Sequence, residues 1–109
     1  MFSERFVNLT PHEVNIGALD VPASGTVARV VVEHREIGKH AGVPLLVGDY
    51  GAVFSLPEPQ IGVLYIVSAA VRSALPHRQD LASPAHLVRD EDGRIIGCLA
   101  LEINSMIAN

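Results

Sequence analysis

The sequence predicts one α+β domain over residues 1–109, with a small, mostly antiparallel β-sheet or partly closed barrel and one short helix. Short runs rich in valine and isoleucine recur between glycine, proline and aspartate residues, a pattern typical of strands joined by turns. Only the stretch 68–75 places apolar residues at helical spacing. A chain of 109 residues is also too short to build a second hydrophobic core.

The N-terminal third of the chain predicts three strands. Residues 6–9 form an apolar run that ends before Pro11, and residues 13–16 alternate between polar and apolar side chains. Residues 21–25 contain proline, serine and glycine, so we expect a loop there. Residues 26–33 are dense in valine and largely apolar on both faces, which predicts a central strand buried on both sides.

The middle of the chain predicts interrupted strands and a rigid connection. Residues 34–42 are polar and contain glycine, so we expect a hairpin connection or a mobile flap. Residues 43–47 and 52–56 are strand pieces, and the two glycines of residues 48–51 indicate a turn or a bulge between them. Two prolines in residues 56–60 exclude both helix and central strand, and they make this connection stiff.

The most informative segment joins a strand directly to the predicted helix. Residues 63–67 are apolar and β-branched, and the helix follows over residues 69–75. Ser68 suits the N-cap position, while Val71 and Leu75 lie one turn apart and should face the core. Because the N-terminus of a helix attracts negative charge, this end of the helix is a candidate anion site.

The C-terminal third predicts a β-hairpin. Asp92 and Gly93 suit its turn, and residues 94–103 form the returning strand. The acidic residues before the turn supply too few correctly spaced oxygens for a calcium-binding loop. Cys98 is the only cysteine and has apolar neighbours, so we expect a buried, unreactive thiol and no internal disulfide.

Composition narrows the class of partner. The formal charge of -4 and the scattered basic residues argue against duplex nucleic acid. Nearly half of this short chain is hydrophobic, which predicts a homo-oligomer. Every cationic residue except Lys39 is arginine, whose planar guanidinium suits phosphate and carboxylate groups. This bias favours a small anionic ligand, although codon usage in a GC-rich genome explains it equally well.

The sequence also predicts where the protein is located. No apolar run approaches the roughly 18 residues that span a bilayer, so we expect no membrane contact. The N-terminal residues lack the basic region, the apolar stretch and the cleavage site of an export signal. We therefore expect a cytoplasmic protein.

The sequence contains no catalytic, metal-binding or cofactor-binding signature. Ser68 lies in Ile-Val-Ser-Ala-Ala rather than on a Gly-x-Ser-x-Gly elbow, and no glycine-rich phosphate loop occurs. None of the five histidines is spaced from another as helix-borne metal ligands are. We therefore expect no catalytic residue, no metal and no cofactor.

Several candidate ligand-binding residues flank the predicted helix. Ser68 could donate its hydroxyl, and Arg72, turned away from the core side, is either plain surface or a clamp for an anion. His77, Arg78 and Asp80 follow the helix as a compact polar cluster. This cluster is either a solvated helix end or part of a binding site.

Two proline-fixed segments add further candidates. Thr10 and His12 flank Pro11, which holds a hydroxyl and an imidazole in place, so they form either an ordinary capped turn or ligand contacts. Glu58 lies in the stiff connection of residues 56–60. It is either part of a plain connector or preorganised for contact with a ligand or a second subunit.

Five blocks in fixed order make the chain resemble a family of small proteins of bacteriophages and prophages. The blocks are residues 8–12 (NLTPH), 56–60 (LPEPQ), 64–68 (LYIVS), 76–81 (PHRQDL) and 88–97 (VRDEDGRIIG). The resemblance implies a small accessory phage protein made in the bacterial cytoplasm, and it carries over no catalytic residue. Accessory proteins of phages often counter host defences, some as oligomers that hold a nucleotide immune signal without cleaving it.

The leading hypothesis is a non-enzymatic homo-oligomer that sequesters a small anionic ligand between subunits, with nucleotide-derived signals as the first class to consider. Arg72 and Arg78 would pair with the anion, Ser68 would donate a hydrogen bond, and His12 and Asp80 would contact polar groups. Two alternatives stay open. One is a protein-binding module that inhibits a host protein, and the other is a small hydrolase that uses His12 and a carboxylate such as Asp80.

Overall fold

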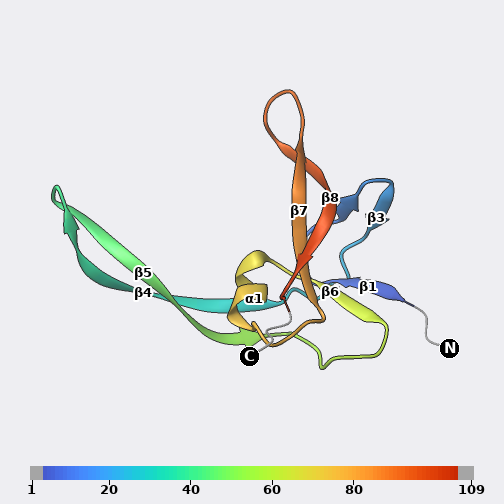
Figure 1. The fold of residues 1–109 in the computed structure, drawn as a ribbon, viewed down its shortest axis with the longest axis horizontal. Coiled ribbons are helices and arrows are strands. Elements are labelled where there is room, and N and C mark those ends of the chain that lie inside the picture. The colour runs from blue at the N-terminus through green and yellow to red at the C-terminus, as the bar shows by residue number, and fades with distance from the viewer. Residues whose placement is uncertain (1–3, 106–109) are drawn as a thin grey trace.

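The computed structural model describes residues 4–105 and confirms the α+β class (Figure 1). One short helix accompanies eight strands in this range. In chain order the elements are β1 (Arg5–Asn8), β2 (Val14–Ile16), β3 (Leu19–Val21), β4 (Arg29–His40), β5 (Val43–Phe54), β6 (Val63–Ile66), α1 (Ala69–Ala74), β7 (Leu81–Arg89) and β8 (Ile95–Ile103).

Six strands form a sheet that is nearly closed on itself. Its order is β1-β6-β7-β8-β2-β3, with β6 parallel to both β1 and β7, and with β7 antiparallel to β8. The two edges approach each other where Asn8, at the end of β1, bridges Ala23, just beyond β3. The expectation of a partly closed barrel is thus confirmed.

Asn8 holds the two edges of the sheet together. Its side chain is almost fully buried, and Nδ2 donates to the carbonyl oxygens of Val21 (3.0 Å) and His12 (2.8 Å). Its Oδ1 accepts from the Thr10 amide at 2.9 Å. A buried amide with its donors and its acceptor satisfied stabilises one geometry of the chain, here the closure of the sheet.

The core lies between the parallel strands, α1 and the residues that lead into β4. The buried members of this cluster are Leu9, Ala28, Val63, Tyr65, Val67, Val71 and Leu81. Val71 is 1% exposed and Leu75 packs against the cluster, which confirms the predicted inward face of the helix. The only polar group of this cluster's side chains is the Tyr65 hydroxyl, and it donates to the carbonyl oxygen of Glu58 at 3.0 Å.

Strands β4 and β5 form a separate two-stranded sheet that projects from the body (Figure 1). We call residues 29–54 the arm. The expectation of a central strand at residues 26–33 is wrong, because β4 and β5 form a sheet of two strands within the described part of the chain. Within both strands only Val30, Val47 and Val53 are half-buried, and every other residue is exposed. The valine-rich pattern correctly predicted an extended backbone, but it wrongly predicted that both faces of the strand are buried.

The details of the arm correct two further expectations. Residues 34–42 are not a long connection, because β4 continues to His40 and only Ala41 and Gly42 form the turn, both with positive φ. Residues 48–51 are not a turn either, since β5 runs through them. A bulge does occur there, because Val30 faces Val53 while Val32 faces Tyr50, which leaves one extra residue on β5.

The remaining strands follow the predicted order with shifted bounds. The loop expected at residues 21–25 is entered by β3, which ends at Val21, and the short strand β3 itself was not predicted. The β7–β8 hairpin is confirmed, although β7 begins earlier than expected. At its turn, Asp90 Oδ1 accepts from the amides of Asp92 and Arg94, both at 2.9 Å. Cys98 is buried, as predicted.

Candidate functional site

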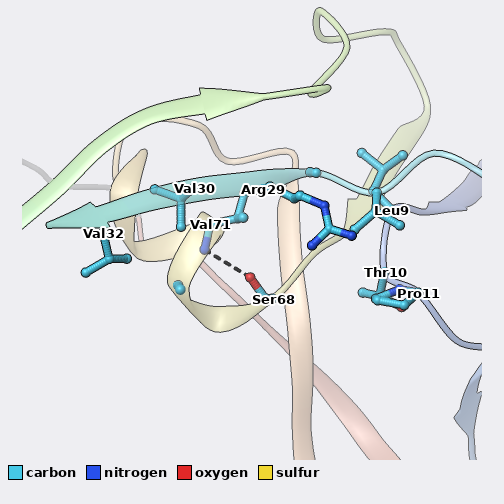
Figure 2. Close-up of a pocket in the computed structure, with 11 residues that line it drawn as sticks. Leu9, Thr10, Pro11, Arg29, Val30, Val32, Ser68 and Val71 are labelled. Carbon is cyan, nitrogen blue, oxygen red and sulfur yellow. Dashed lines mark hydrogen bonds between the residues drawn. The ribbon is translucent and has the colours of Figure 1, made fainter.

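A pocket of about 310 Å³ lies where three segments meet: the turn after β1, the root of the arm and the first turn of α1 (Figure 2). Eight of its eleven lining residues are apolar, and the other three are a threonine, a serine and an arginine. The full set is Leu9, Thr10, Pro11, Val27, Ala28, Arg29, Val30, Val32, Ser68, Ala70 and Val71.

Among residues 4–105, Arg29 is the only ionisable side chain that lines this pocket. Its side chain extends toward the turn that carries Thr10 and Pro11 (Figure 2). Among residues 4–105 this side chain forms neither an ion pair nor a hydrogen bond, whereas Arg72 and Arg78 both have carboxylate partners. An unpaired guanidinium beside an apolar recess is suited to bind a carboxylate or a phosphate in a bidentate manner.

Ser68 is the N-cap of α1, as predicted. Its backbone is extended (φ -68, ψ 157), and its Oγ accepts from the Val71 amide at 3.2 Å (Figure 2). The hydroxyl hydrogen takes no part in that bond, so Ser68 can still donate to a ligand in the pocket. Because α1 has only six residues, its dipole is small, and we assign the positive potential of the pocket to Arg29.

Thr10 contributes the other hydroxyl of the pocket, but its hydrogen is used within the turn. Its Oγ1 donates to Asn8 Oδ1 at 2.6 Å, and the carbonyl oxygen of His12 lies 3.0 Å away. The interpretation as a turn capped by its own side chain therefore describes Thr10 well. His12 is exposed and does not line the pocket.

Arg72 lies on the other side of α1, in a network of its own. Its side chain is 13% exposed, so it is not plain surface. Nε donates to Ser83 Oγ at 2.9 Å, Nη1 donates to Asn104 Oδ1 at 3.1 Å, and Nη2 lies 3.3 Å from Glu102 Oε2. These partners tie the helix to β7 and to the end of β8.

Arg78 and Asp80 pair with each other immediately after the helix. Arg78 Nε and Nη2 donate to the two carboxylate oxygens of Asp80 at 2.7 and 2.8 Å, and Nη2 also donates to the carbonyl oxygen of Pro57 at 3.1 Å. The hydrogen bonds from Arg78 lower the pKa of the Asp80 carboxyl. They also raise the pKa of the Arg78 guanidinium.

The predicted site residues therefore fall into separate groups. Thr10 and Ser68 come together at the pocket, while Arg72, Arg78 and Asp80 belong to the network beyond α1. Glu58 has an exposed side chain on the 56–60 connection, where its backbone carbonyl accepts from Tyr65. Within residues 4–105, no hydrogen bond joins His12 to Asp80.

Two functional positions were missed from the sequence. Arg29 lies in the valine-rich run of residues 26–33, for which we expected burial. Because an unpaired charge is rarely buried, the arginine itself was the sequence signal that part of this run is exposed. Asn104 donates to the carbonyl oxygens of Arg72, Leu75 and Arg78, at 3.1, 2.9 and 2.9 Å. Nothing in its sequence neighbourhood indicates that it caps a helix about thirty residues earlier.

Two searches of the described residues bear on the expected partners. Among residues 4–105 no group of three histidine, cysteine or acidic side chains is arranged to hold a metal ion. In the same range, no helix has the length and apolar character needed to cross a membrane.

Comparison of this chain with known proteins identifies no family. The chain matches no protein-family model, and neither a curated protein nor a solved structure is detectably similar to it.

Proposed function

We propose that the protein binds and sequesters a small anionic ligand that also carries an apolar ring, such as a nucleotide-derived signal, without cleaving it. The observation that carries this proposal is the unpaired Arg29 guanidinium in an otherwise uncharged, mostly apolar pocket. An apolar recess binds the flat face of a ring, and the single cation fixes the orientation of the anionic group.

The size of the pocket supports a ligand of mononucleotide scale. Ligand pockets typically occupy about 300–1,000 Å³, and this one has a volume of about 310 Å³. A larger ligand would leave part of its surface outside the pocket, where a second subunit could cover it. In this proposal Arg29, rather than Arg72 or Arg78, pairs with the anion. The guanidinium groups of Arg72 and Arg78 already bind oxygen atoms of the protein.

Binding without cleavage follows from the chemistry of the lining residues. Arginine stays protonated at neutral pH, so Arg29 cannot exchange a proton with a substrate. Asp80 does not line the pocket and is held as a carboxylate by Arg78, which makes it a weak general base. A hydrolase that uses His12 and Asp80 is therefore less well supported than a binding protein.

The resemblance to phage accessory proteins supplies the biological setting of the proposal. A protein made in the bacterial cytoplasm that captures a nucleotide immune signal would protect the phage by lowering the concentration of that signal. Sequestration requires stoichiometric amounts of protein and tight binding, but no turnover. A homo-oligomer would supply several such sites in one particle.

The test combines an unbiased and a directed measurement. Protein purified from defence-expressing bacteria is denatured, and mass spectrometry identifies any small molecule that is released. In parallel, calorimetry measures the affinity for AMP, a simple anion with an apolar ring. Arg29→Ala should weaken AMP binding at least tenfold, whereas Arg94→Ala, at the exposed tip of the β7–β8 hairpin, should leave it unchanged. Equal affinities of the two variants would refute the site.

A second candidate function, a module that inhibits a host protein, is favoured by the apolar side chains exposed on both hairpins. The same purification discriminates between the two candidates. A host inhibitor retains a protein in a pull-down and releases no small molecule, whereas a sequestering protein does the reverse.

A further inference from the structure

The arm contacts the body of the protein at its root (Figure 1). Within residues 4–105, no hydrogen bond or ion pair connects residues 29–54 to the remainder of the chain. The β4–β5 ladder and the Arg35–Asp49 ion pair both lie inside the arm. Just before the arm begins, the Ala28 amide donates to the carbonyl oxygen of Leu9 at 3.0 Å. The arm can therefore change direction beyond Ala28 without breaking a polar contact with the body.

The apolar packing that holds the arm in place is small. Val30 on β4 and Val53 on β5 pack against the core cluster, and both are only half-buried. These two valines hold a hairpin whose strands contain 24 residues and span about 40 Å. Segments with few buried apolar contacts open at low cost in free energy. A small rotation at the root would also move the distant tip of the arm by a large distance.

The pocket lies across the junction between the arm and the body. Arg29, Val30 and Val32 line it from the arm. The turn after β1 and the first turn of α1 line it from the body (Figure 2). A ligand that fills the pocket contacts both sides at once. The complete site therefore exists only while the arm is docked on the body.

We propose that the ligand fixes the arm against the body, so that the direction of the arm depends on whether the pocket is occupied. Without ligand, the arm moves about its root and is docked for only part of the time. A ligand that contacts both sides of the junction selects the docked arrangement and reduces this motion. The coupling is reciprocal, because the apparent affinity falls in proportion to the docked fraction. This inference rests on the proposed function, since it concerns the same pocket.

The first test changes the docking of the arm without changing a residue that lines the pocket. Val53 packs against the core cluster but is not among the lining residues, so Val53→Ala should reduce the docked fraction. The Kd for AMP, measured by calorimetry, should rise at least threefold. Val47→Ala is the matched control, because Val47 is also half-buried on β5 but lies outside the set that packs against this cluster among residues 4–105. It should bind AMP as the wild type does, and equal affinities of the two variants overturn the proposal.

The second test follows the motion of the arm itself. The chain contains no tryptophan, so a single introduced one reports on its own position. Val43→Trp places it at the exposed tip of the arm, and Ile95→Trp places it at the start of β8, on the other hairpin. In time-resolved fluorescence anisotropy, saturating AMP should suppress local motion at position 43 and leave position 95 unchanged. No change at position 43, or the same change at both positions, contradicts the coupling.

The outcomes separate this inference from the proposed function. If AMP binds the wild-type chain but the arm moves as freely as before, only the coupling fails. If AMP does not bind the wild-type chain, the proposed function is refuted and the coupling is refuted with it.

Discussion

Arg72 and Asn104 exchange hydrogen bonds in both directions. Arg72 Nη1 donates to Asn104 Oδ1 at 3.1 Å, and Asn104 Nδ2 donates to the carbonyl oxygen of Arg72 at the same distance. Asn104 is 8% exposed and also binds the carbonyl oxygens of Leu75 and Arg78. One side chain from beyond β8 thus completes the C-terminus of α1.

We expect Asn104→Ala to lower the free energy of unfolding by about 2–4 kcal/mol, because it removes three hydrogen bonds to carbonyl oxygens at the end of α1 and the one that Arg72 Nη1 donates. Urea denaturation monitored by circular dichroism measures the effect. Asn15→Ala, which alters a half-exposed amide on β2, should cost less than about 1 kcal/mol. A similar loss in the two variants would show that Asn104 is not the cap inferred here.

The Arg78–Asp80 pair should make stability depend on pH in the acid range. Hydrogen bonds from Arg78 lower the pKa of Asp80 in the folded state, so the pair stabilises the protein above the ordinary aspartate pKa of about 3.9. This contribution disappears as the pH falls through the lower, folded pKa. Urea titrations at several pH values should show Asp80→Asn less stable than wild type near pH 7 and the difference shrinking below pH 4. A constant difference would contradict the assignment.

Ser68→Ala should lower the free energy of unfolding by about 1 kcal/mol, because the Val71 amide loses its capping acceptor. Ser68→Asn keeps an acceptor at this position and should restore most of the loss. Chemical denaturation of the three proteins provides the comparison. If alanine and asparagine behave alike, the cap is not what stabilises this end of α1.

Filling the pocket should block the ligand while Arg29 remains in place. Ala70 lines the pocket and lies in α1, where leucine is well tolerated. Ala70→Leu should therefore weaken AMP binding at least tenfold in calorimetry, with little change in helix content. Ser73→Leu, on an exposed position of the same helix, is the control that should bind normally.

Local patterns predicted the backbone of this protein better than its packing. Alternation and β-branching indicated the strands, and Ser68 with its apolar positions indicated α1. The place of β4 was missed, since a valine-rich strand in an exposed two-stranded sheet has the same pattern as one buried in a larger sheet. Residues 34–42 were misread as a connection because polar side chains are also what an exposed strand carries.

The candidate site was only partly predictable for a similar reason. Thr10 and Ser68 carry local signals, a proline-fixed turn and a helix cap, and both line the pocket. The partners of Arg72 and Arg78 lie elsewhere in the chain, at Asn104 and at Pro57, and no local pattern reveals such pairings. Arg29 becomes a candidate only once the fold shows that its guanidinium has no partner.

The parallel pairing of β1 with β6 determines the order in which parts of this protein can fold during translation. Arg5 pairs with Val63, and the 57 residues between them include the entire arm. During translation the arm therefore leaves the ribosome before β1 has its neighbour. Because closing so long a loop delays the sheet, the arm, whose two strands are neighbours in sequence, can form its hairpin before the six-stranded sheet is complete.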